Sequence, residues 1–419
     1  MALIVQKYGG TSVGKPDRIK SVARRVAGYV ARGHKMVIVV SAMSGETNRL
    51  LGLAKEISPT PDPRELDVIA STGEQVTIGL LSMALKDLGL KARSYTGGQV
   101  RILTDSAFTK ARILSIDEHN IRRDLDEGHV VVVAGFQGVD EKGNITTLGR
   151  GGSDTTGVAL AAALGADECQ IYTDVDGVYT TDPRIVAKAR KLKAVTYEEM
   201  LELASVGAKV LQTRSVGLAM KEGVRIQVLS SFVDDSAPDA DSIPGTMIVT
   251  DAELEKYQVE RQLITGIAAD KNEAKITLTR VPDRPGAVAN IFSPLADANI
   301  NVDMIIQNVG RDKGETDVTF TCPQADLVRC TDILENRRDA IGYNRLIPDT
   351  KVTKISVVGV GMKSHAGVAS TMFSSLADRK INIQAISTSE IKISVMIDED
   401  ETELAVRVLH TAYGLDAVS

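Results

Sequence analysis

A gapless internal repeat is the strongest constraint that this sequence places on its own fold. Residues 286–302 align with residues 367–383 at a constant offset of 81, and eight of the 17 aligned positions are identical. Each copy is preceded by a strand-like segment, at residues 275–279 and 354–358. A repeat of this length indicates a duplicated α+β domain rather than a solenoid.

The sequence before the repeat alternates between strand and helix patterns. Residues 36–40 and 130–134 are continuous apolar, β-branched runs, whereas apolar residues recur at three- and four-residue steps within residues 16–31. Buried strands separated by helices indicate a mostly parallel sheet that is covered on both faces. In such sheets ligands bind beyond the carboxyl ends of the strands, which is where this chain has glycine-rich or polar segments.

Composition excludes several classes of protein. The 419 residues carry a net charge of −6 and only 4% are aromatic, which disfavours a nucleic-acid partner. The three cysteines, Cys169, Cys322 and Cys330, follow neither a disulfide nor a metal-ligand spacing. The first apolar run is too short for a signal peptide and no run has the length of a membrane span, so we expect a cytoplasmic protein without a membrane partner.

The first glycine-rich segment follows an N-terminal strand. Gly9 to Lys15 nearly fits a P-loop, but Pro16 stands where the Mg²⁺-binding hydroxyl should be, which argues against that class. Lys7 at the strand end, followed by Gly9 and Gly10, would instead place one cation beside exposed backbone amides, as a phosphate site needs. The alternative is an ordinary turn with an exposed lysine.

Two further segments combine glycine with charge. Arg150 precedes two glycines and an Ala-rich helix that Ser153 or Asp154 would cap, and its guanidinium can bind a carboxylate through two hydrogen bonds. An ordinary capped helix is the competing interpretation. Glu74 lies in the first turn of another helix, where either the helix dipole or a ligand's ammonium group would explain it.

A third polar segment, residues 172–184, combines acidic residues with hydroxyls after a strand. Its spacing is wrong for an EF-hand. It could surround a nucleotide and its Mg²⁺, or it could simply form a series of turns.

Five segments taken together resemble the signatures of the aspartate kinase family. They are residues 7–13, 41–44, 71–74, 149–154 and 173–184. The repeat resembles the C-terminal pair of ACT domains in the monofunctional bacterial enzymes of that family. One small departure is Tyr8, where the family more often has Phe.

The resemblance implies an amino-acid kinase α/β fold, a mostly parallel sheet sandwiched by helices, followed by two ferredoxin-like α+β ACT domains. The catalytic domain would span residues 1–245 and the ACT domains residues 265–345 and 346–419. The polar composition of residues 234–242 separately indicates a loop or linker that closes the first domain. The sequence leaves open whether an internal start at Met247 yields a separate regulatory subunit.

The resemblance also implies a reaction. The γ-phosphoryl group of ATP, bound with Mg²⁺, would pass to the side-chain carboxylate of L-aspartate and give 4-phospho-L-aspartate, which begins lysine, threonine, methionine and diaminopimelate synthesis. Because that carboxylate is already ionised at neutral pH, no general base is required. The alternatives are a kinase for another small carboxylate and a catalytically dead amino-acid sensor.

Residue roles follow from matching the motifs, with no resident metal site. The catalytic residues would be Lys7 and Asp154. The aspartate site would comprise Thr47, Glu74, Arg150, Gly151, Gly152 and Ser153. The nucleotide site would comprise Lys7, Tyr8, Gly9, Gly10, Ser41, Thr173, Asp174, Tyr179, Asp182, Arg184 and Lys209.

The ACT domains imply feedback inhibition by lysine, threonine or both. The matching effector residues of the first domain are Asp283, Pro285, Gly286, Ala287, Asn301, Asp303 and Gln307. Those of the second are Val368, Ala369, Asn382, Ile383, Ser389 and Glu390. Because ACT domains usually pair across chains, the resemblance also implies a homo-oligomer, a dimer or a tetramer.

Overall fold

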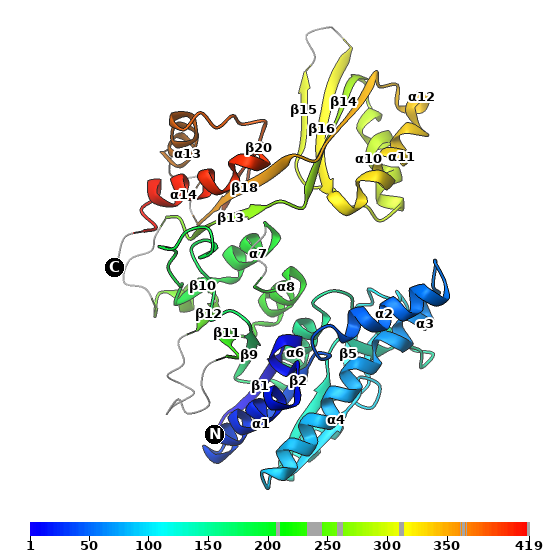
Figure 1. Cartoon of the computed structure of the whole chain (residues 1–419), viewed down its shortest axis with the longest axis vertical. Helices are drawn as coiled ribbons and strands as arrows, with labels where there is room; N and C mark the ends of the chain where they lie inside the picture. The colour runs from blue at the N-terminus through cyan, green and yellow to red at the C-terminus, as the bar shows by residue number, and fades with distance from the viewer. Residues whose placement is uncertain are drawn as a thin grey trace. The chain divides into compact units, whose positions relative to one another are not determined.

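The chain forms two compact units in the computed structural model (Figure 1). The structure describes residues 1–206, 210–232, 245–257, 263–309, 314–360, 362, 365 and 367–416. The first unit holds Met1–Tyr179, Lys191–Ala204 and the described residues between 210 and 257. The second holds Thr180–Arg190, residues 205–206 and the described residues from 263 onward.

An eight-stranded sheet of order β10-β12-β11-β9-β1-β2-β6-β3 organises the first unit. Its strands are β1 (Leu3–Tyr8), β2 (Lys35–Val40), β3 (Ala92–Tyr95), β6 (Val130–Ala134), β9 (Glu168–Thr173), β10 (Ala194–Thr196), β11 (Ile226–Ser230) and β12 (Thr246–Val249). All neighbouring strands run parallel except β11 and β12. The prediction of a mostly parallel sheet is therefore confirmed.

The helices of the first unit begin with α1, which has the predicted bounds. They are α1 (Pro16–Ala31), α2 (Glu46–Ile57), α3 (Pro63–Ala70), α4 (Thr72–Asp87), α5 (His119–Asp126), α6 (Gly152–Leu164), α7 (Tyr197–Ser205), α8 (Thr213–Glu222) and α9 (Asp251–Leu254), with the 3₁₀ helix η1 (Gly10–Val13). By length and composition alone, the described stretch Pro63–Asp87 could cross a membrane. Half of its apolar window is buried within the protein, as is typical of a core helix.

The two faces of β1 serve different purposes. Ile4 and Tyr8 belong to the apolar core, in which Val22 and Leu81 are fully buried. Helices α1 and α4 complete this core (Figure 1). Alternate residues of a strand point to opposite faces, so Lys7 faces the other side, toward α6. This alternation places Lys7 on the face of β1 opposite the one that carries Ile4 and Tyr8.

Helix α6 starts at Gly152, six residues before the Ala-rich segment that begins at Val158. Its N-cap is Gly151 at φ +73°, without a side-chain cap, so the prediction that Ser153 or Asp154 caps the helix is wrong. Both residues lie inside the first turn and are buried. Their side chains are therefore directed into the protein interior rather than used to terminate the helix.

A smaller sheet of order β5-β4-β7-β8 completes the first unit. Its strands are β4 (Ile102–Thr104), β5 (Ile113–Ile116), β7 (Gln137–Val139) and β8 (Ile145–Thr147). Asp67 of α3 is 1% exposed and accepts hydrogen bonds from the Thr147 amide at 2.8 Å and the Thr147 hydroxyl at 2.6 Å. This carboxylate fixes the end of β8, just before the Arg150 loop.

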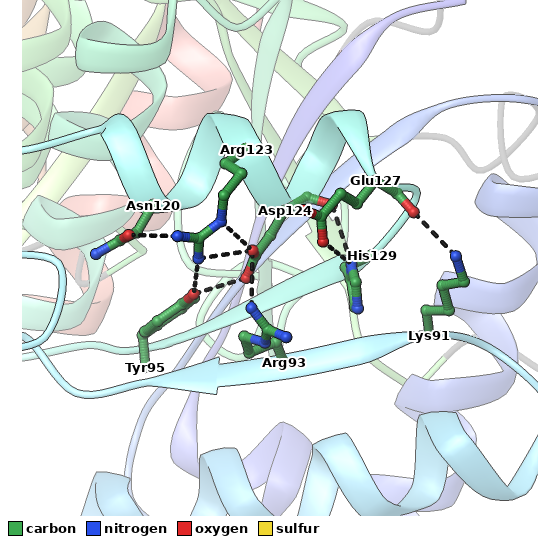
Figure 2. Close-up of polar contacts among 8 residues, drawn as sticks. All are labelled: Lys91, Arg93, Tyr95, Asn120, Arg123, Asp124, Glu127 and His129. Carbon is green, nitrogen blue, oxygen red and sulfur yellow. Dashed lines mark hydrogen bonds and ion pairs between the residues drawn. The ribbon is translucent and has the colours of Figure 1, made fainter.

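A polar network closes the β3 edge of the large sheet. Figure 2 shows Arg93 and Tyr95 of β3 and Arg123 of α5 directed at the carboxylate of Asp124. The Tyr95 hydroxyl donates to Asp124 at 2.6 Å, and Arg93 donates at 3.0 Å. Unpaired strand edges invite unwanted pairing, and the charged side chains here blunt this one.

The second unit contains two four-stranded sheets, of order β15-β16-β14-β17 and β13-β18-β20-β19. The first has β14 (Glu273–Pro282), β15 (Ile305–Val309), β16 (Glu315–Pro323) and β17 (Arg345–Asp349), with α10 (Ala287–Asp297), α11 (Leu327–Glu335), α12 (Arg338–Ile341) and η3 (Gln324–Asp326). The second has β13 (Gly266–Asp270), β18 (Val352–Val358), β19 (Ala385–Thr388) and β20 (Lys392–Asp398), with α13 (Gly367–Asp378), α14 (Thr402–Ala412) and η5 (Glu399–Glu401). The duplicated α+β architecture is confirmed.

Two segments join the second unit from unexpected places in the sequence. Strand β13 precedes the first repeat, yet it pairs antiparallel with β18 of the second, with Ile267 opposite Val357. Thr180–Arg190, from within the sequence of the predicted catalytic domain, also belongs here. The Thr180 hydroxyl lies 2.9 Å from the His410 ring, and Val186 packs into the core beneath α13 and α14.

Candidate active site

The polar segments that follow the central strands meet at one edge of the large sheet. Strands β1, β2, β6 and β9 run parallel, so Gly9, Ser41, Gly135 and Asp174 all follow carboxyl ends at the same edge. A cavity of about 480 Å³ opens there. Its lining includes Lys7, Gly9, Gly10, Ser41, Thr47, Glu74, Arg150, Gly151, Gly152, Ser153, Asp154 and Thr173.

An ion pair stands at the base of these segments. The ammonium nitrogen of Lys7 on β1 lies 2.5 Å from Oδ1 of Asp154 on α6, and each side chain is only 10% exposed. The close approach of α6 to β1 depends on Gly157, where an added Cβ would lie 3.3 Å from Cβ of Lys7. Screening is weak at such burial, so the lysine is a strong, oriented cation at the cavity wall.

Gly10 and Gly151 allow the loops that line the cavity to pack closely against neighbouring residues. A Cβ on Gly10 would lie 3.0 Å from the Ala42 carbonyl oxygen, tighter than ordinary contact. Gly151 has φ +73°, and a Cβ there would lie 1.8 Å from Cγ of Gln212. Neither position tolerates a side chain without rearrangement, which explains glycine in both loops.

Glu74 carries the clearest electrostatic signal at the cavity. It is 3% exposed, and its Oε1 accepts a hydrogen bond from the Ala42 amide at 2.9 Å. Its Oε2 is buried and has no hydrogen-bond partner among the described residues. Burial raises the pKa of Glu74 to about 7, against the opposing hydrogen bond from Ala42. The helix dipole alone does not explain an unsatisfied carboxylate oxygen at a cavity wall, so a ligand with hydrogen-bond donors fits better.

Tyr8, Tyr179, Asp182 and Arg184, which were predicted for the nucleotide site, are not among the residues that line this cavity. The ring of Tyr8 is fully buried and stacks on Tyr172 with centroids 4.7 Å apart, so its side chain faces the core rather than the cavity. The Tyr179 hydroxyl donates to Asp176 at 2.9 Å. Asp182 and Arg184 form a two-residue ion pair in the second unit, and Lys209 lies outside the described residues.

The cavity also brings in residues that the sequence analysis did not select. They include Asn48, Phe136, Leu211 and Gln212. Phe136 was detectable, because it follows β6 at the ligand-binding edge of the sheet. Gln212 was not, because a neutral side chain before a helix gives no chemical pattern. Lys15 of the near-P-loop is exposed at the N-cap of α1 and is not part of this lining.

The predicted effector residues occupy equivalent places in the two repeats. Gly286, at φ +91°, caps α10, and Val368 and Ala369 lie in the first turn of α13. Before β15 and β19 lie Asn301, Asp303, Asn382 and Ile383, with Gln307 in β15 and Ser389 and Glu390 after β19. Asp283, Pro285 and Ala287 flank the α10 cap. Among them Asp303 forms an ion pair with Lys354.

Comparison with known proteins agrees with this architecture. The model described as the amino acid kinase family matches residues 2–230, and ACT domain models match residues 275–338 and 355–413. The aspartate kinase of Pseudomonas putida is 60% identical over 417 residues, covering 100% of this chain and 98% of its own. The chain belongs to the aspartate kinase family. It is therefore an enzyme of the kinase class with C-terminal ACT domains.

Two solved members of the aspartate kinase family share the fold. Aspartokinase III of E. coli in complex with aspartate and ADP, in its R-state, superposes with a TM-score of 0.81 at 26% identity, over 98% of this chain and 99% of that one. The same enzyme in complex with lysine and aspartate, in its T-state, gives a TM-score of 0.73 at 25% identity, again over 98% and 99%.

Proposed function

We propose that this chain transfers the γ-phosphoryl group of ATP to the side-chain carboxylate of L-aspartate, giving 4-phospho-L-aspartate. The observation that carries the proposal is the Lys7–Asp154 pair, which lines one cavity together with Arg150 and Glu74. That cavity offers a cation for a phosphoryl group, a cation for a carboxylate and an anion for an ammonium group. ATP and L-aspartate together carry these three groups.

The transfer needs charge stabilisation and alignment more than proton transfer. Lys7 would neutralise the charge that develops on the transferring phosphoryl group, and Asp154 would hold the lysine side chain in place. The attacking carboxylate has no proton to lose at neutral pH. Mg²⁺ accompanying ATP would neutralise phosphate charge. Asp154, the carboxylate that pairs with Lys7 in this lining, would orient the Mg²⁺-bound nucleotide.

Substrate selection follows from the charges around the cavity. Arg150 and Ser153 would bind the α-carboxylate, Glu74 would accept from the ammonium group through its unsatisfied oxygen, and Thr47 would lie near that group. Gly151 and Gly152 allow the substrate close approach to the α6 N-terminus, whose amides favour an anion. Recognition of both α-groups would leave the side-chain carboxylate as the nucleophile.

The nucleotide would bind beside Lys7. Gly9, Gly10 and Ser41 would contact the phosphates and Thr173 the adjoining part of the nucleotide. The remaining contacts within the first unit are proposed for Asp174 and Tyr179. ADP in the E. coli neighbour supports a nucleotide site in this fold.

We extend the proposal to regulation and setting. Lysine in the T-state neighbour supports feedback by lysine, threonine or both at the ACT domains, in a homo-oligomer that pairs through them. The product would enter lysine, threonine, methionine and diaminopimelate synthesis. Three free, buried cysteines suit a reducing cytoplasmic location.

The experiment is a hydroxylamine trap of the acyl phosphate, with ATP and a panel of L-aspartate, D-aspartate, L-glutamate and carbamate. The expected product is the hydroxamate of L-aspartate, formed at least tenfold faster than any other. Equal rates across the panel would favour a kinase for another carboxylate, and no product with lysine still binding would favour a sensor. Lys15→Ala is the matched control and should leave the rate within twofold.

A further inference from the structure

The N-terminal end of α8 is fastened to the Arg150 loop by an arginine that the catalytic proposal does not use. The guanidinium of Arg214 donates to the Leu148 carbonyl oxygen at 2.8 Å and to the Ala111 carbonyl oxygen at 2.7 Å. Burial and the neighbouring Arg112 lower the pKa of Arg214. One partly buried cation thus ties α8 to two different backbone segments.

Both carbonyl acceptors lie in backbone segments that are hydrogen-bonded next to the Arg150 loop. Leu148 lies two residues before Arg150, and its own amide donates to the Phe136 carbonyl at 2.8 Å. The Ala111 amide donates to the Thr147 carbonyl at 2.9 Å. Two carbonyls on either side of the β8 end are therefore held by the same side chain.

A second contact from α8 reaches the loop beyond Arg150. Gln212, the N-cap residue of α8, lies so close to Gly151 that an added Cβ there would be 1.8 Å from its Cγ. Arg214 and Gln212 therefore contact the loop on the two sides of Arg150. On the opposite side, Asp67 of α3 accepts from the Thr109 amide at 2.9 Å and from Thr147.

We propose that Arg214 is a positioning residue for Arg150: together with Gln212 it makes the start of α8 a brace that holds the loop in the conformation that binds the substrate carboxylate. The inference rests on the proposed aspartate-binding role of Arg150. Arg150 itself is exposed on a loop that contains glycines at positive φ on both sides, Gly149 at +77° and Gly151 at +73°. Such a loop has many conformations, and a displacement of about 1 Å at a binding group lowers catalysis about 10²-fold.

The brace makes a prediction that a purely structural role does not. Loss of the two Arg214 hydrogen bonds should weaken aspartate binding while leaving ATP binding intact, because the nucleotide contacts proposed for Lys7, Gly9 and Gly10 lie on β1 and the loop after it. A defect that merely loosened the unit would instead impair both substrates together. Lysine cannot reproduce the fork that reaches two carbonyls at once.

The experiment is steady-state kinetics of the full chain with Arg214→Ala, Arg214→Lys and Arg150→Ala. Arg112→Met is the matched control, since Arg112 is exposed and adjacent. For Arg214→Ala we expect the KM for aspartate to rise at least tenfold and the KM for ATP to stay within twofold. Free guanidinium at millimolar concentration should restore aspartate affinity to Arg214→Ala and leave the affinity of Arg112→Met unchanged. The KM of Arg214→Lys for aspartate should lie between those of Arg214→Ala and the unmodified chain.

The outcomes separate the brace from the proposed function. If Arg150→Ala raises the KM for aspartate but folded Arg214→Ala does not, the brace is wrong and the aspartate site stands. If Arg150→Ala changes nothing, the substrate role of Arg150 and the brace both fall. Should Arg214→Ala not fold, Gln212→Ala and Arg214→Lys decide: a KM for aspartate within twofold of the unmodified chain in both would overturn the proposal.

Discussion

Among the described residues, two buried lysines are paired with carboxylates, and their surroundings differ. Lys7 pairs with Asp154 at the wall of a cavity whose loops are rich in glycine. Lys354 on β18 is 3% exposed and pairs with Glu273 on β14 at 3.2 Å and with Asp303. Its partners come from the other repeat of the second unit, so this pair joins the two ACT modules.

The comparison shows that burial of an ion pair does not by itself identify an active site. Around Lys354 the apolar residues Met304, Val352 and Met396 form a small cluster that also joins the repeats. Around Lys7 the neighbours are hydroxyls, glycines and further charges that face open space. These surroundings support the catalytic role proposed for Lys7 and favour a structural role for Lys354.

Removing the carboxylate of Asp154, the partner of Lys7, should lower turnover more than any of the substitutions outside this ion pair that follow below. We expect Asp154→Asn to lower kcat about 10²- to 10³-fold, as loss of an oriented electrostatic group does. The free energy of unfolding should change by less than about 2 kcal/mol, because water in the cavity can solvate Lys7. Initial rates of acyl-phosphate formation and denaturant unfolding measure the two quantities. A kcat within threefold of that of the unmodified chain would contradict the catalytic role proposed for the Lys7–Asp154 pair.

The opposite pattern is expected at the other lysine. Lys354→Met leaves Glu273 buried without its counter-ion and should destabilise the second unit by about 3 kcal/mol. Uninhibited turnover at low temperature should stay within about twofold. Urea unfolding followed by circular dichroism tests this, and a stability equal to the unmodified chain would contradict it.

The stabilisation that Lys354 gives the second unit should decrease as the pH rises. Burial opposes the shift, but Glu273 and Asp303 raise the pKa of Lys354. The contribution is therefore fully present below the ordinary lysine pKa and is lost as the pH rises through the higher folded value. Unfolding curves of the unmodified chain and of Lys354→Met should converge at alkaline pH.

The pH dependence of aspartate affinity tests whether Glu74 binds the substrate ammonium group, and the expected effect is smaller than that of Asp154→Asn. If its ionised form accepts from the substrate ammonium, aspartate affinity should rise about tenfold per pH unit until the pH passes the Glu74 pKa of about 7. Glu74→Gln should raise the KM for aspartate at pH 8 and abolish this dependence. A Glu74→Gln enzyme with an unchanged pH profile of KM would contradict the role.

Replacing the Glu74 carboxyl with the amide of glutamine should raise the free energy of unfolding. Its folded pKa of about 7 exceeds the ordinary value of 4.5, so its stabilising contribution is present below 4.5 and is lost as the pH rises through about 7. Glu74→Gln should consequently be about 1 to 3 kcal/mol more stable than the unmodified chain above that pH. Thermal unfolding at pH 8 measures it, with Glu65→Gln on the exposed surface as the control.

The smallest effect on stability and turnover is expected at the β3 edge, outside the cavity lining (Figure 2). Burial opposes the shift, but hydrogen bonds from Tyr95 and Arg123 lower the pKa of Asp124. Its contribution is present above the ordinary aspartate pKa and is lost as the pH falls through the lower folded value. Asp124→Asn should cost about 1 to 2 kcal/mol at neutral pH and leave kcat unchanged. A change in kcat would show that this edge is coupled to the cavity.

Local patterns in the sequence were sufficient for much of this fold. The apolar periodicity of α1, the continuous strands β2 and β6 and the duplicated repeat are all local signals, and each was confirmed. The position of Lys7 at a strand end followed from parallel-sheet topology. The neighbours of Glu74 along the sequence did not distinguish a dipole role from a ligand role. Only the fold shows that Oε1 accepts from Ala42, which is distant in sequence, while Oε2 has no hydrogen-bond partner among the described residues.

Long-range packing explains what the sequence did not predict. Strand β13 joins the sheet of the second repeat because Ile267 can pack there, and no local pattern distinguishes the two sheets. The early start of α6 depends on Gly151, whose positive φ replaces a side-chain cap. Arg214 resembles any other helix arginine until its two carbonyl acceptors are seen.

The claim that the surroundings of a buried lysine distinguish chemistry from cohesion is tested most directly by one measurement. The rate of L-aspartate hydroxamate formation at saturating ATP and aspartate is compared for Lys7→Met and Lys354→Met at a temperature where both are folded. We predict a loss of at least about 10³-fold for Lys7→Met and less than about twofold for Lys354→Met. Turnover of Lys7→Met within tenfold of the unmodified chain, or an equal loss in both variants, would contradict the account.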